Sequence, residues 1–178
     1  LRALKRTRHG GEVVLGDWLE VWLRDFICPN REATTVHGYE NIIRLHLVPS
    51  LGVLKLPELT PALLQRYYAE LLDKGLSHNT VRKHHVLLHT ALEAAVRQGL
   101  LRENVTRLVT PPTRELPSHR YYDPAQLREL FARCAGTEIE PAVKLAGYLG
   151  LRRSEICGLK WRSVDLAAKI VTVREVRT

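Results

Sequence analysis

Apolar residues recur at helical spacing over most of the first hundred residues. In the first stretch they fall at positions 15, 18, 19, 22, 23 and 26, which is the spacing of one buried helix face, and Pro29 is expected to stop this helix. A second helix is predicted from about Glu32 to Val48, with apolar or aromatic residues at positions 36, 39, 42, 43 and 47. Pro49 is expected to close it.

Capping residues mark the next two helices. Thr60 followed by Pro61 is typical of an N-cap and the first helical position, so a third helix is predicted from there through Leu72, ended by Gly75. Ser77 is predicted to cap a fourth and longest helix, which ends at Gly99. Four helices with apolar faces indicate one small bundle over residues 15–107.

The pattern changes after the bundle. Residues 108–120 contain three prolines and no apolar period, which predicts an extended linker and a domain boundary. Three further helices are predicted at residues 123–134, 140–149 and 154–161, and the alternating, β-branched stretch 169–175 predicts a strand. A lone strand needs partners, and we find none elsewhere in the sequence. We therefore expect the second domain, residues 121–178, to be cut off before its sheet is complete.

Composition narrows the class of protein. With 178 residues, 45% of them hydrophobic, the chain can form one generous domain or two small ones. No apolar run is long enough for a membrane span, and the start does not resemble a signal peptide. Cys28, Cys134 and Cys157 fit neither a disulfide framework nor a zinc site, so we expect a reducing cytoplasm and a buried, apolar Cys157. The absence of methionine indicates a piece of something longer.

Charge points to a polyanionic partner. The sequence has 27 Lys and Arg against 19 Asp and Glu, a formal net charge of +8. The first ten residues carry four basic and no acidic side chains, so residues 1–14 are interpreted as a basic arm. A second basic cluster, from Arg82 to His85, lies near the start of the fourth predicted helix. Both features are common ways of neutralising phosphates.

The order of parts resembles a known family. A basic helical domain is followed by a proline-bearing linker, by Gly-Leu-Arg-x-Ser-Glu at residues 150–155, and by Leu-x-Trp-x-x-Val-Asp-Leu at residues 159–166. Together with residues 56–61 and 80–100, these segments resemble the core-binding and early catalytic regions of tyrosine-type site-specific DNA recombinases, the phage integrase family. The resemblance implies a mainly α fold: a four-helix SAM-like core-binding bundle, a linker, and the incomplete start of an α/β catalytic domain that mixes helices with a small antiparallel sheet.

The resemblance also implies a chemistry. In this family a tyrosine attacks a DNA phosphodiester to form a 3′-phosphotyrosine, and two arginines, a lysine and one or two histidines stabilise the charged transition state. Arginine suits this task because its planar guanidinium stays protonated and can donate to two phosphate oxygens. The motif places the first catalytic arginine at Arg152, with Glu155 one turn further as its support. Neighbouring Arg153 should matter far less.

The other catalytic groups of the family are expected beyond this sequence. The family lysine follows the strand predicted at residues 169–175, and His-x-x-Arg and the nucleophilic tyrosine come later still. The last tyrosine here is Tyr148, before Arg152, so all six tyrosines are interpreted as core or surface aromatics. We expect the fragment to bind DNA without cleaving it. No metal or nucleotide cofactor is expected, because the phosphotyrosine conserves the bond energy.

Positions that resemble DNA-contacting positions of such bundles lie on two helices and the linker. They are Thr34, Thr35, His37 and Arg44 on the second helix, Asn79, Thr80, Arg82 and Lys83 on the fourth, and Arg114 and Arg120 in the linker. Phosphate contacts of this kind position a protein without reading sequence. The alternative for each is a solvated helix face.

The partners implied by the resemblance are a double-stranded attachment site and other recombinase protomers, four in a synapse. Accessory DNA-bending or excision factors are a further expectation. The reaction would integrate or excise a phage or mobile element, and Xer-like chromosome-dimer resolution stays open.

Two other interpretations use the same residues. Residues 145–159 also fit the degenerate pattern of a helix-turn-helix, as in a non-catalytic DNA-binding regulator. The continuation through residues 159–166 and the upstream bundle favour the recombinase.

His84, His85 and His89 suggest a metal site, but no cysteine or carboxylate completes it. We expect DNA contact or core packing instead, with His85 on the inner face and the other two more outward. Trp18 and Trp22 are expected in the core.

Overall fold

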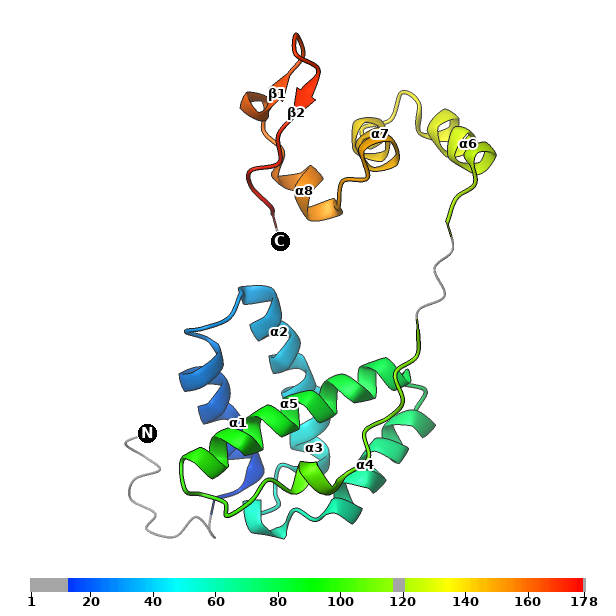
Figure 1. Ribbon diagram of the computed structural model, residues 1–178. Coiled ribbons are helices and arrows are strands. Elements are labelled where there is room, and N and C mark those ends of the chain that lie inside the picture. Colours follow the sequence, from blue (N-terminus) through cyan, green and yellow to red (C-terminus); the bar gives the residue numbers. More distant parts are fainter. Residues whose placement is uncertain (1–12, 117–120, 178) are drawn as a thin grey trace. The chain divides into compact units, whose positions relative to one another are not determined.

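The computed structural model describes residues 13–116 and 121–177. The chain forms two compact units that divide between residues 116 and 117. The described part of the first unit is mainly helical, and that of the second has helices followed by a small hairpin (Figure 1). The predicted class, mainly α with a small antiparallel sheet, is confirmed.

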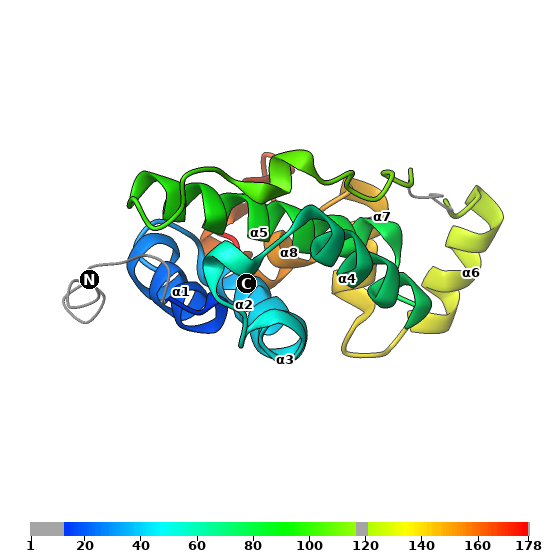
Figure 2. The ribbon, with the colours of Figure 1, turned by 90° about the horizontal axis from the view of Figure 1, so that it is seen from below.

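Four helical segments build the first unit. The first joins α1 (Leu15–Trp22) to a π-helical turn at Leu23–Ile27, and the second joins α2 (Ala33–Ile42), a π-helical turn at Ile43–Leu47 and α3 (Val48–Leu51). The third and fourth are α4 (Pro61–Asp73) and α5 (His78–Arg97), with short 3₁₀ turns at Leu56–Glu58 and Val105–Leu108. The long helix α5 packs against both α1 and α4 (Figure 2). These segments confirm the predicted bundle.

The capping residues act as predicted. Thr60 Oγ1 accepts a hydrogen bond from the backbone N–H of Leu63 at 3.2 Å, and Ser77 Oγ accepts one from Thr80 at 3.2 Å. Each bond satisfies a backbone donor that has no partner within its helix. Two helix starts were therefore recognisable from single residues.

Pro49 does not close the second helix, contrary to the prediction. The helix runs through it to Leu51. Just before the proline the hydrogen bonding widens, so that the N–H of Val48 bonds to the carbonyl of Ile43. Proline has no N–H to donate, and its ring crowds the preceding turn of a helix. A widened turn accommodates it by shifting the backbone hydrogen bonds from the usual i−4 carbonyl to the i−5 carbonyl.

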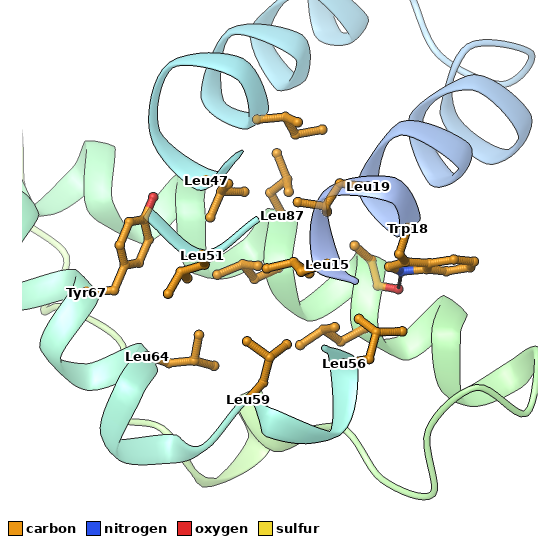
Figure 3. Packing of buried hydrophobic residues seen from close by; sticks show 14 of the residues in the cluster. Leu15, Trp18, Leu19, Leu47, Leu51, Leu56, Leu59, Leu64, Tyr67 and Leu87 are labelled. Carbon is orange, nitrogen blue, oxygen red and sulfur yellow. Dashed lines mark hydrogen bonds between the residues drawn. The ribbon is translucent and has the colours of Figure 1, made fainter. Parts of the chain in front are cut away.

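The core of the first unit collects apolar side chains from all four segments (Figure 3). Trp18 and Trp22 are buried, as predicted, and the indole N–H of Trp18 donates to the carbonyl of Ala91 at 2.9 Å. Full burial of one such aliphatic or aromatic side chain contributes about 1.5 to 3 kcal/mol. Other members of the core include Leu15, Leu19, Leu47, Leu51, Leu56, Leu59, Leu64, Tyr67 and Leu87.

Part of the predicted linker belongs to the first unit. Val109 is buried in the core, and the chain up to Leu116 groups with the bundle. Between Val109 and Leu116 the backbone is extended, without helix or strand. The described segment is therefore held on the bundle over much of its length.

The second unit contains α6 (Pro124–Cys134), α7 (Glu140–Leu149) and α8 (Arg153–Gly158), then the strands β1 (Val164–Asp165) and β2 (Ile170–Val171). The first two helices lie where they were predicted. The third is shorter than predicted: it ends at Gly158, the backbone of Leu159 is extended, and a 3₁₀ turn follows at Trp161–Ser163.

The expectation that the predicted strand has no partner in the sequence was wrong. Val164 pairs with Val171 and Asp165 with Ile170 in an antiparallel hairpin. The paired segment is also shorter than residues 169–175. Two residues of β1 are too few to show the alternation that identifies a strand.

Candidate nucleic-acid interface

A groove between α2 and α5 brings together five of the ten proposed DNA-contacting residues. Its lining comprises Thr35, Gly38, Tyr39 and Ile42 from α2, and Asn79, Thr80, Arg82, Lys83 and Val86 from α5. The α2 residues follow the spacing of one helix face, and so do positions 79, 82, 83 and 86 of α5. Two helix faces therefore form the groove within the first unit.

The groove combines apolar side chains with basic ones. Tyr39, Ile42 and Val86 supply apolar surface, and 49% of Val86 is exposed. Lys83 is exposed and Arg82 half-buried, so two cations lie beside that surface. Such a combination suits a partner with alternating apolar and anionic parts, as in a sugar–phosphate backbone.

Asn79 and Arg82 also hold the chain that leaves the bundle. The side-chain amide of Asn79 donates to the carbonyl of Glu115 at 2.8 Å and accepts from the N–H of Glu115 at 3.2 Å. Arg82 donates to the carbonyl of Pro112 at 3.2 Å, and His78 Nδ1 lies 2.5 Å from a Glu115 carboxylate oxygen. Both hydrogen-bonding groups of Asn79 are therefore used within the protein.

The remaining proposed contacts lie apart from the groove lining. Arg44 is exposed on the π-helical turn after α2, and Arg114 is exposed in the extended segment. Thr34 and His37 are exposed on α2, outside the lining. Arg120 lies outside the described residues.

Four groove residues were not proposed from the sequence as DNA contacts: Gly38, Tyr39, Ile42 and Val86. Tyr39 and Ile42 were counted only as core positions, and Tyr39 does stack on Trp22, with ring centroids 5.8 Å apart. The signal that could have found them is the shared face of positions 35, 38, 39 and 42. Of these four positions, only Thr35 was proposed as a DNA contact.

Arg152 lies at the start of α8 in the second unit. It is the N-cap residue, and its side chain is 83% exposed. Glu155 holds it twice: one carboxylate oxygen accepts the backbone N–H of Arg152 at 2.8 Å, and the other lies 3.2 Å from a guanidinium nitrogen. Glu155 is the less exposed partner, at 19%. A guanidinium held at its base and open to solvent can donate to an incoming phosphate.

The segment after β2 covers one side of α8. The N–H of Arg177 donates to the carbonyl of Ser154 at 2.9 Å, and Glu175 pairs with Lys160 and with Arg162. These contacts lower the pKa of the Glu175 carboxyl, first through the hydrogen bond from Lys160. A recognition helix of a helix-turn-helix inserts into the major groove, whereas α8 has only 6 residues and is partly covered. The geometry therefore does not favour that alternative.

Three of the four histidines of α5 each meet a hydroxyl group. Nδ1 of His84, His85 and His89 lies 2.8, 3.1 and 2.8 Å from the hydroxyls of Tyr67, Tyr68 and Thr106. Within the described ranges, no set of three or more His, Cys, Asp or Glu side chains is arranged to hold a metal ion. The histidines join α5 to α4 and to the turn at Val105–Leu108.

The prediction that His85 is the inner histidine was wrong. His84 is fully buried, and His85 is half-buried. Both positions are compatible with the spacing from Val81 to Leu88, and the packing of α5 selects His84. Burial lowers the pKa of His84 to about 4, and the neighbouring His46 adds repulsion.

Cys157 is exposed, so the expectation of a buried Cys157 was wrong. α8 has only 6 residues, and it approaches residues 175–176 through Gly158 rather than through Cys157. Cys134 is the buried cysteine, and all three are free thiols. Across the described segments, no helix is both long and apolar enough to span a membrane.

Comparison with known proteins identifies the family. Residues 14–72 match the model of the phage integrase N-terminal SAM-like domain. The XerC-like tyrosine recombinase of Caldanaerobacter subterraneus subsp. tengcongensis is 27% identical over 93% of this chain and 44% of its own length. A solved phage integrase SAM-like domain from Moorella thermoacetica is 39% identical over 64% of this chain and 97% of its own, with a TM-score of 0.51. The chain belongs to the tyrosine recombinase (phage integrase) family.

The fold comparison extends into the second unit. A lambda integrase dimer bound to a COC′ core site matches 86% of this chain and 56% of its own, with a TM-score of 0.77. At 15% identity this match shows the fold alone. The chain spans 38–50% of the length of three curated relatives that it matches.

Proposed function

We propose that this chain holds duplex DNA and supplies a phosphate-binding arginine to a site-specific recombinase that acts through a 3′-phosphotyrosine. Family membership supports the reaction class. The finer roles rest on the residues of the two units.

The observation that carries the proposal is the setting of Arg152. Its guanidinium is open to solvent while Glu155 restrains both its backbone and its side chain. Restraint before the substrate arrives is what makes a donor effective at a developing negative charge, because the donor need not reorganise during the reaction. We assign Arg152 to phosphate stabilisation and Glu155 to its positioning.

The groove between α2 and α5 supports the DNA-binding half of the proposal. It gathers Thr35, Thr80, Arg82 and Lys83, which the family resemblance had suggested separately. Arg44, Arg114 and Arg120 are proposed as outlying phosphate contacts. For Asn79 we propose a role in holding the extended segment rather than direct contact with DNA, since its amide is bonded to Glu115.

We further propose that these 178 residues bind DNA without cutting it. The last tyrosine in the sequence is Tyr148, and the family nucleophile follows the arginine of this motif. Neither a metal nor a nucleotide takes part in the proposed reaction. The proposed reaction takes place in the cytoplasm. Its DNA partner is an attachment site of a phage or mobile element. Its protein partners are further protomers in a tetrameric synapse and accessory DNA-bending or excision factors.

Arg152→Ala tests the catalytic assignment in a protein that carries this chain together with its nucleophilic tyrosine. Covalent attachment to a DNA substrate should fall on the order of a hundred to a thousandfold, while DNA binding stays largely intact. Gel analysis of the protein–DNA adduct measures the first and fluorescence anisotropy the second.

Arg153→Ala is the matched control, because Arg153 is an exposed arginine on the same turn. It should form the adduct at close to the original rate. Unchanged attachment in Arg152→Ala would contradict the assignment. Loss of DNA binding with no adduct in any variant would favour a non-catalytic regulator.

A further inference from the structure

Gly38 differs from every other glycine that the structure describes. Four described glycines adopt positive φ, where other residues are strained: Gly75, Gly99, Gly136 and Gly150. Four others leave little room for a Cβ, which would press against a neighbouring atom: Gly16, Gly52, Gly147 and Gly158. Gly38 has ordinary helical geometry, and a Cβ built there would meet no atom within 4 Å.

The fold therefore gives no reason for glycine at this position. Gly38 lies inside α2, where glycine destabilises a helix by comparison with alanine, because its backbone has more freedom to lose. Alanine would fit the backbone and the available space. What distinguishes Gly38 is its place in the groove lining, on the same face of α2 as Thr35 and Ile42.

We infer that Gly38 is a clearance position, where the missing side chain lets the sugar–phosphate backbone of duplex DNA lie directly against α2. This inference rests on the proposed function. The backbone N–H groups inside a helix are already bonded, so the contact at Gly38 is one of van der Waals packing rather than hydrogen bonding.

The neighbours of Gly38 match that partner. Ile42 on α2 and Val86 on α5 offer apolar surface to a deoxyribose, and Arg82 and Lys83 offer cations to the phosphates on either side. Glycine permits an approach closer by about one methyl group than any other residue would. Close approach also brings the phosphates nearer to the cations, where their attraction is stronger.

Gly38→Ala separates this role from a structural one, because the two predict opposite signs. The variant should unfold at a higher temperature, by about 4 to 8 °C for a domain of this size. It should bind a mixed-sequence DNA duplex about tenfold more weakly, because a methyl group forced into a close contact is poorly accommodated. Gly38→Leu should weaken binding further, while keeping a good helix-forming residue.

Thermal unfolding by circular dichroism and binding by fluorescence anisotropy measure the two effects on the full chain. Gln65→Ala, on the exposed part of α4 and outside the groove lining, is the control and should bind DNA normally. If Gly38→Ala is more stable and binds equally well, the clearance role is wrong and the proposed function stands. If the unchanged chain binds no duplex, the proposed function fails and the clearance role fails with it.

Discussion

His84 shows how one residue can couple folding to pH. It is fully buried against Tyr67 and lies close to His46. Among residues 13–116 and 121–177, no group makes a hydrogen bond with its buried Nε2. A proton on this ring would place an uncompensated charge in the core. The folded protein therefore keeps the ring neutral, and the pKa of His84 falls from 6.5 to about 4.

The sign of the effect follows from proton uptake. Between about pH 4 and 6.5 the unfolded chain binds a proton at His84 and the folded chain does not, so stability falls as the pH drops through this window. Unfolding in urea should show a loss of about 2 to 3 kcal/mol between pH 7 and pH 4.5, since one pKa unit corresponds to about 1.4 kcal/mol.

A substitution can isolate this histidine. His84→Leu should remove most of that loss, whereas His37→Leu, at an exposed position, should retain it. An equal pH dependence in His84→Leu and the unchanged chain would show that other groups govern acid stability.

At the scale of elements, sequence reasoning succeeded where one residue type has one physical meaning. Thr60 and Ser77 predicted helix starts because their hydroxyls cap free N–H groups. It failed where the structure of a segment depends on its contacts with other segments or turns. Pro49 stays inside a helix because the preceding turn widens, and β1 is recognisable only by its pairing with β2. The groove could not be predicted for the same reason: helical spacing predicts the face of α2 and the face of α5, but not that these two faces lie side by side.

Asn79 offers a test of how α5 holds the extended segment. Asn79→Ala removes both bonds to the backbone of Glu115, so the amide of Glu115 should exchange with solvent faster. Hydrogen exchange followed by NMR measures this change. Lys83→Ala, one helical turn away, should leave the exchange unaltered, and equal protection in Asn79→Ala would show that other contacts hold the segment.

At the scale of the whole molecule, the sequence predicted the family and the bundle, because both depend on local pattern. The role of Arg152 stays a prediction. The division after Leu116 depends on contacts of residues 109–116 with α5, which composition does not reveal. The proposed reaction depends on both units: Arg152 has a role only if DNA is held by the protein, and we propose the groove of the first unit as the place that holds it.

Binding of duplex DNA across a range of salt concentrations tests that requirement most directly. The chain should bind a mixed-sequence duplex with an affinity that falls steeply as salt rises, because each phosphate contact releases counterions. Lys83→Ala should reduce the slope of log affinity against log salt by about 1, while Lys74→Ala, exposed at the end of α4, should leave it unchanged. Absent or salt-independent binding, or equal slopes in the two variants, would contradict a DNA-holding role for the groove.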